Sequence, residues 1–163
     1  MSRIEVVETY LTFGDLTDRA STNRIFVHHV GEITRDVSAA EIHNWHLDKG
    51  WAGIGYHYVI RKDGTVERGR PKWAVGSHAQ GGNYNSVGIC LAGDTNQEAI
   101  TPEQRRSLVL LLADLCGLYE IWPSRGNIFG HTELKGDTEC PGALLMADLD
   151  NIVADVAKER GVA

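Results

Sequence analysis

Short runs of β-branched and aromatic residues alternate in this chain with segments that begin on helix caps, and this alternation most constrains the fold. Residues 25–27, 86–91 and 128–129 are brief apolar runs, which predict buried strands. Residues 55–70 contain two further runs, with a strand expected over residues 56–60, joined by Asp-Gly. That pair favours a hairpin turn, because glycine accepts a positive φ angle. We therefore predict a mixed sheet.

Three segments have the start signals of helices. Ser38 and Glu41 have the spacing of a capping box, which predicts a helix as far as about residue 49. A capping threonine, a proline at the first helical position and a glutamine at the third open residues 101–119. A last helix is expected over residues 141–160. We predict one α+β domain over residues 1–163, a mixed central β-sheet flanked by about three helices.

Composition limits the partners that the chain can have. The 163 residues are 42% apolar, with a net charge of −6 and no visible basic stripe, which argues against a nucleic-acid partner. No run approaches the ~20 apolar residues of a membrane span, and acidic residues stand where a signal peptide needs an apolar stretch. We expect a monomer made in the cytoplasm without a signal peptide, which needs help to reach any substrate outside.

The three cysteines fall into two classes. An odd number in a chain with no export signal argues against a disulfide framework. Cys90 lies in a predicted strand and Cys116 in a predicted helix, so both are expected to be buried packing residues. Cys140 differs, because polar residues precede it and Pro-Gly follows it.

Several of the seven histidines have ordinary structural interpretations. His43 and His46 are expected on an exposed or half-buried helix surface, since no third ligand accompanies them. His57 alternates with two tyrosines, which favours a satisfied core or surface histidine. His29 should point away from its neighbour His28 and is interpreted as structural.

His28, His131 and Cys140 lie at positions where functional side chains are often found, namely strand ends and a loop before a helix. Each histidine ends a short strand, and the cysteine lies nine residues beyond His131 in a loop before a helix. Two imidazoles and one thiolate would give zinc three ligands and leave a fourth position open, the form of a catalytic site. Spacing alone leaves a second interpretation open: a cysteine hydrolase, with a lowered thiol pKa before the helix and one histidine as base.

Five segments carry a more specific signal. They are residues 25–28, residues 51–58 followed by Asp-Gly at 63–64, residues 74–79 followed by 83 and 85–89, residues 130–131 and residues 138–142. In order and spacing they resemble the zinc-dependent N-acetylmuramoyl-L-alanine amidases of the bacteriophage-lysozyme and peptidoglycan-recognition-protein type. The resemblance covers nearly the whole chain.

The resemblance implies zinc (Zn2+) bound by His28, His131 and Cys140, and a catalytic hydroxyl from Tyr56. The other catalytic position falls on Thr138, where the phage enzymes have lysine and catalytic recognition proteins have threonine. A lysine can neutralise a developing oxyanion as a full charge, whereas a threonine can only donate a hydrogen bond to it.

The resemblance also implies that His78 and Asn83 contact the glycan or the stem peptide in a groove. The alternative is a surface loop held by Gly81 and Gly82. Two acids near the ligands, Glu133 and Glu139, are interpreted as solvated loop residues, so the general base stays unassigned.

The function implied is hydrolysis of the amide between N-acetylmuramic acid and L-alanine in bacterial peptidoglycan, acting on the cell wall after release. A phage or prophage endolysin is favoured. The alternatives are a cytoplasmic wall-recycling amidase and a module that binds peptidoglycan without cutting it. Non-catalytic relatives usually lack the cysteine ligand, so Cys140 favours an enzyme.

Overall fold

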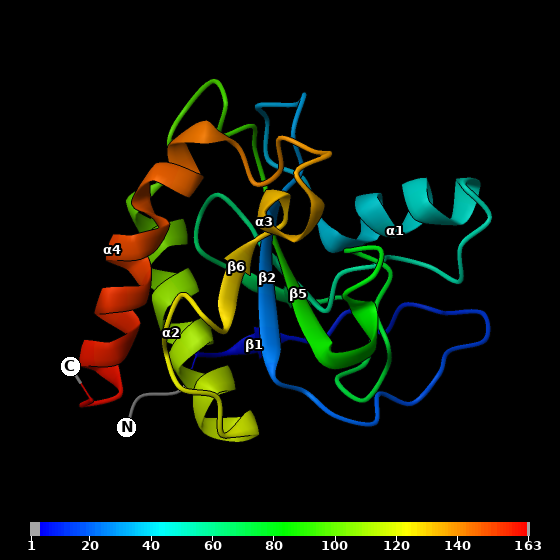
Figure 1. Cartoon of the computed structure of the whole chain (residues 1–163). Helices are drawn as coiled ribbons and strands as arrows, with labels where there is room; N and C mark the ends of the chain where they lie inside the picture. The colour runs from blue at the N-terminus through cyan, green and yellow to red at the C-terminus, as the bar shows by residue number, and fades with distance from the viewer. Residues whose placement is uncertain (1–3, 163) are drawn as a thin grey trace.

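The computed structural model describes residues 4–162 and shows a six-stranded mixed sheet with helices on both faces (Figure 1). The strand order is β1-β4-β3-β5-β2-β6, and only the β3–β4 hairpin is antiparallel. The strands are β1 (Val6–Val7), β2 (Arg24–His29), β3 (Tyr58–Ile60), β4 (Val66–Arg68), β5 (Ser86–Leu91) and β6 (Ile128–Gly130). This confirms the predicted mixed sheet and its hairpin.

The strand expected over residues 56–60 begins two residues late. Tyr56 and His57 lie just before β3, although their carbonyls still accept from the amides of Arg70 and Gly69, at 2.8 Å each. The amide of His57 bonds to Gly88 on β5, and its ring accepts from the amide of the same residue. Tyr56 and His57 are therefore held against the neighbouring strands although they precede β3.

The three predicted helices are confirmed, and a short fourth one joins them. The helices are α1 (Ala39–Asp48), α2 (Pro102–Tyr119), α3 (Thr132–Lys135) and α4 (Ala143–Glu159). Ser38 accepts from the amide of Glu41, and Thr101 and Gln104 form both bonds of a capping box. Helix α3 has four residues and no apolar periodicity of its own, so the sequence did not predict it.

The sheet separates a large core from a smaller one. Ile25, Val27 and the alternate residues of β5 pack with α2 and α4, which lie side by side in Figure 1. Cys90 packs with α1 on the other face, where Figure 1 shows that helix well apart from the α2–α4 pair. His28 is the register partner of Cys90, so alternation along the strand places its side chain on this second face.

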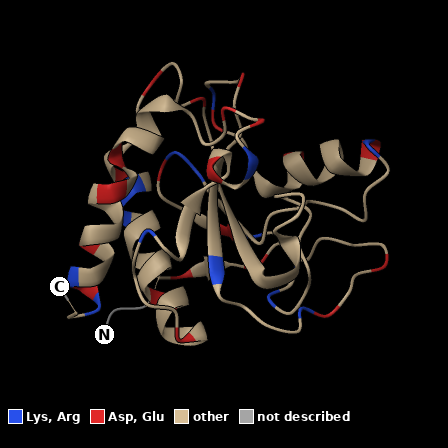
Figure 2. Ribbon diagram, viewed as in Figure 1, with Lys and Arg blue, Asp and Glu red and all other residues tan. Residues whose placement is uncertain are grey.

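Charged side chains are of both signs along α2 and α4 (Figure 2). Ion pairs cross between these helices from Arg105 to Asp148 and Asp155, and from Arg106 to Glu159. Within residues 4–162, no helix combines the length and the apolar character needed to cross a membrane.

Candidate metal centre and groove

Three donor side chains meet at one edge of the sheet. His28 lies near the end of β2, and His131 follows β6, its parallel neighbour, so both histidines reach the edge where these strands end. Cys140 returns to the same edge because its carbonyl accepts from the amide of Thr132 at 2.7 Å. One ligand atom from each of the three residues lies within 4.8 Å of the other two, a spacing at which the three could hold one metal ion.

The donor atoms fit zinc in identity and in spacing. The Nδ1 atom of His28 lies 3.5 Å from the Sγ atom of Cys140. A tetrahedral ion with Zn–N of ~2.05 Å and Zn–S of ~2.3 Å separates such a pair by about 3.6 Å. Two imidazoles and one thiolate are also ligands that zinc prefers, and three protein ligands leave its fourth position open.

A chain of hydrogen bonds determines which ring nitrogen of His28 is unprotonated and can bind a metal. Ser86 Oγ donates its one proton to the carbonyl of Gly82 at 2.6 Å, so toward His78 Nε2, 3.2 Å away, it can only accept. His78 then carries its proton on Nε2 and accepts at Nδ1 from His28 Nε2, 2.9 Å away. His28 is thereby left with an unprotonated Nδ1 facing Cys140, the tautomer that metal ligation requires.

Burial favours the neutral form of each of these groups. Desolvation lowers the pKa of His28 and of His78 well below the usual histidine value, with smaller contributions from neighbouring histidines. Burial also raises the pKa of the Cys140 thiol to about 12, against the opposing bond from the His29 amide. This direction is opposite to the lowered thiol pKa that a cysteine hydrolase uses, whereas a bound divalent cation would itself deprotonate a coordinating thiol.

Tyr56 lies beside the donors without being one of them. Its ring centroid is 5.0 Å from that of His28 and 5.7 Å from that of His46. Burial raises the pKa of Tyr56 well above its usual value, and the thiols of Cys90 and Cys140 add to the shift. The phenol therefore stays protonated, and a hydrogen bond with the Cys90 side chain contributes to the same shift. Cys90 and Cys116 are buried packing residues, as predicted, and Cys90 lies in the small core against which Tyr56 packs.

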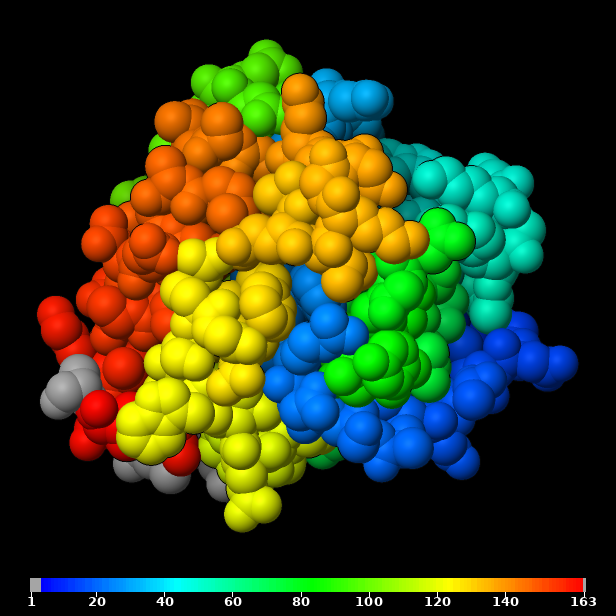
Figure 3. All heavy atoms as spheres, viewed as in Figure 1, coloured from blue at the N-terminus to red at the C-terminus, as the bar shows by residue number. Residues whose placement is uncertain are grey.

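A groove of about 510 Å³ opens beside His131, lined by Trp51, Ser77, His78, Ala79, Gln80, Asn83, His131, Leu134, Lys135, Asp137 and Thr138. Two segments form the walls of this groove, and they touch each other in Figure 3. They are the orange segment that contains α3 and the green segment around residue 80. Thr138 Oγ1 accepts from the amide of Cys140 at 3.2 Å, which leaves the hydroxyl proton free to donate elsewhere.

The two residues expected to contact substrate are already engaged within the protein. His78 uses both ring nitrogens, on His28 and Ser86, and Asn83 Oδ1 accepts from the amides of His78 and Ala79 at 2.9 and 2.8 Å. Both residues line the groove, and their contact with substrate stays a prediction.

The expectation that His43 and His46 lie on an exposed or half-buried surface was wrong. Both are buried, and their Nδ1 atoms accept from the amides of Ile54 and Gly55 at 3.0 and 2.9 Å. The loop before Tyr56 folds back over α1, and its buried amides need acceptors that helical periodicity cannot reveal. By contrast, His57 is a satisfied core histidine, one of the two interpretations predicted for it.

Comparison with known proteins identifies the family. Residues 18–143 match the N-acetylmuramoyl-L-alanine amidase family. The chain belongs to this amidase family. The endolysin of Escherichia phage T7 is 45% identical over 108 residues, which are 63% of this chain and 72% of that protein.

Solved structures of other amidases and recognition proteins share the fold. The endolysin N-acetylmuramoyl-L-alanine amidase LysCS from Clostridium intestinale URNW superposes with a TM-score of 0.84 at 34% identity, covering 99% of each chain. Drosophila PGRP-LB gives a TM-score of 0.80 at 26% identity, covering 90% of this chain and 92% of its own. The resemblance inferred from the five sequence segments is thus confirmed.

Sequence reasoning missed the residues that support the donors of this amidase. Ser86 was seen only as the first residue of a strand, although a hydroxyl at the start of a fully buried run is a usable signal. Thr95 and Asn96, in the loop after β5, contact the turn around Cys140, and no local pattern indicates this.

Proposed function

We propose that this chain is a zinc-dependent amidase that hydrolyses the amide between N-acetylmuramic acid and L-alanine in bacterial peptidoglycan. The observation that carries the proposal is the convergence of His28, His131 and Cys140 beside a groove, within an amidase family member. The endolysin relatives support a role in degrading the cell wall after release. A monomer is sufficient for this role, because the three donors come from one chain.

The metal would be held by His28 Nδ1, His131 and Cys140 Sγ. Zinc in such a site supplies a Lewis acid for the amide carbonyl and activates water near neutral pH. The protein fixes the geometry of the donors. His78 and Ser86 hold the ligating tautomer of His28, and the amide of His29 donates to Cys140 Sγ at 3.4 Å.

Tyr56 and Thr138 would stabilise the charge that develops on the carbonyl oxygen of the substrate. The phenol of Tyr56 stays protonated, and the hydroxyl of Thr138 has its proton free while its oxygen accepts from the Cys140 amide. One well-placed donor of this kind is worth roughly 10²–10³ in rate. Thr138 is neutral, so it offers a hydrogen bond where a lysine would offer a full charge.

The decisive experiment measures metal and product together. Purified peptidoglycan is digested, and the new amino termini of L-alanine are counted alongside the zinc bound per chain. His131→Ala and Cys140→Ala should lose both zinc and activity. Cys116→Ala is the matched control, because this thiol lies in the α2 core away from the groove, and it should keep both.

Two results would contradict the proposal. Full release of L-alanine termini by zinc-free protein would exclude a metal-dependent amidase. Binding of peptidoglycan by zinc-loaded protein with no termini released would instead indicate a module that recognises the polymer without cutting it.

A further inference from the structure

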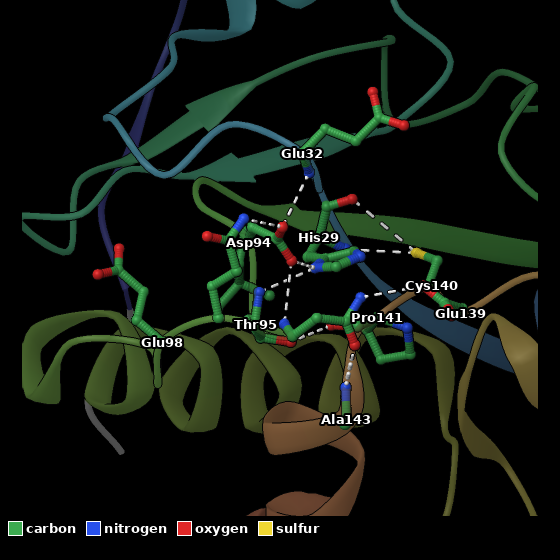
Figure 4. Close-up of polar contacts among 12 residues, drawn as sticks. His29, Glu32, Asp94, Thr95, Glu98, Glu139, Cys140, Pro141 and Ala143 are labelled. Atoms are coloured by element: carbon green, nitrogen blue, oxygen red, sulfur yellow. Dashed lines mark hydrogen bonds and ion pairs between the residues drawn. The ribbon is translucent and has the colours of Figure 1, made fainter.

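The loop that follows β5 crosses the turn that carries Cys140 (Figure 4). Its central residue, Thr95, is 2% exposed and makes three bonds. The amide of Thr95 donates to His29 Nδ1 at 3.1 Å, and its hydroxyl donates to the carbonyl of Pro141. Its carbonyl accepts from the amide of Leu144 at 3.0 Å. Thr95 thus joins the end of β2 to the residues that follow Cys140.

The same loop supplies the cap that α4 lacks. The N-cap position of α4 is Gly142, which has no side chain to accept from the first amides of the helix. Asn96 Oδ1 accepts from the amide of Ala143 at 2.9 Å, and Asn96 Nδ2 donates to Glu139 at 3.3 Å. The loop is therefore hydrogen-bonded to residues on both sides of Cys140.

The loop is packed closely against the turn. Gly142 has a φ of +93°, and a methyl group built on it would overlap the Thr95 hydroxyl. Asp94 also holds the loop in place, because its carboxylate accepts from the amides of Glu32 and Asn96 at 3.1 and 3.0 Å. The loop and the turn around Cys140 are thus packed directly against each other.

We propose that Thr95 and Asn96 are positioning residues that hold Cys140 Sγ beside His28 Nδ1. The proposal rests on the zinc site of the proposed function, and it adds two residues that touch neither the metal nor the substrate. Loss of either contact lets the turn relax, so that the thiol no longer stays at the distance from His28 that a shared ion needs.

The first test measures zinc affinity by competition with a chromophoric chelator. Thr95→Val removes the hydroxyl and nearly keeps the shape, and Asn96→Ala removes the side-chain cap at an exposed position. Each should weaken zinc binding by roughly 10–100-fold, the usual effect of losing a contact that orients a ligand. Thr95→Ser keeps the hydroxyl and should restore most of the affinity.

The matched control is Thr101→Val, which removes the cap of α2 far along the chain from the turn. It should lower the melting temperature and leave zinc affinity unchanged. Equal losses in Thr101→Val and Thr95→Val would show that zinc affinity follows stability alone, which overturns the proposal. Thr95→Val and Asn96→Ala with wild-type affinity would overturn it directly.

The second test uses metal-free protein, so it holds whether or not zinc is the native metal. Alkylation of Cys140 by iodoacetamide is followed by mass spectrometry, with buried Cys90 and Cys116 as internal references. Thr95→Val and Asn96→Ala should speed the alkylation of Cys140 several-fold and leave both references unchanged. Unchanged rates at Cys140 refute the positioning role, whereas a wild-type protein that binds no zinc refutes the proposed function instead.

Discussion

Replacing Ser86 by alanine should weaken zinc binding, although Ser86 is not a ligand. The hydroxyl accepts from His78 Nε2, and its loss leaves that buried N–H without a partner, at about 1–3 kcal/mol. His78 can avoid this by moving its proton to Nδ1, which faces His28 Nε2. His28 must then accept at Nε2 and carry its own proton on Nδ1, the atom needed for the metal. The unpaired N–H therefore favours the second form in the metal-free protein, and zinc binding is weakened by the free energy needed to return His28 to its ligating tautomer.

The expected loss of zinc affinity is roughly 10–100-fold, which corresponds to about 1.4–2.8 kcal/mol and falls within the range of the broken bond. Chelator competition measures the affinity. Long-range ¹H–¹⁵N NMR of the metal-free protein shows which nitrogen of His28 carries the proton. In the wild type that nitrogen should be Nε2, and in Ser86→Ala the Nδ1 form should appear.

Ser107→Ala is the matched control, because its hydroxyl donates to the carbonyl of Gly64 at 2.6 Å in a buried site on α2. It should lose stability without losing zinc. If Ser86→Ala binds zinc as tightly as the wild type and His28 keeps its proton on Nε2, the hydrogen-bond chain has no part in selecting the tautomer.

Three further predictions concern catalysis and stability. Tyr56→Phe should keep its zinc and melting temperature and lose roughly 10²–10³ in kcat; wild-type turnover would remove the phenol from the mechanism. Thr138→Val should lower kcat while Thr138→Ser retains it, in peptidoglycan assays at matched zinc content; equal rates would leave the hydroxyl without a role. His46 has its pKa lowered to about 4, mainly by burial, so the unfolded chain takes up a proton below about pH 6.5 while the folded chain stays neutral. Stability should therefore fall between about pH 6.5 and 4, by up to about 1.4 kcal/mol per pH unit from this group. His46→Asn keeps an acceptor for the Gly55 amide and should flatten the fall in urea unfolding, and parallel curves would contradict this.

The sequence by itself indicated the three long helices, the hairpin and the three candidate metal ligands. Helix caps at Ser38 and Thr101 and the Asp-Gly turn are local signals, because each depends on bonds within a few residues. The ends of two short apolar runs located His28 and His131, since parallel strands present their ends at one edge. The five segments then indicated the family without any knowledge of the contacts.

Only the tertiary structure decided what surrounds those donors. A buried polar atom must find a partner wherever the fold brings one, and that partner need not be near in sequence. His28 depends on His78, fifty residues away, and the turn around Cys140 depends on Thr95. For the same reason His46, on a helix that looked exposed, is buried under a loop whose amide it accepts. Periodicity and spacing depend on residues that are near one another in the sequence. The partners of buried polar groups are often distant in sequence, so only the folded structure shows them.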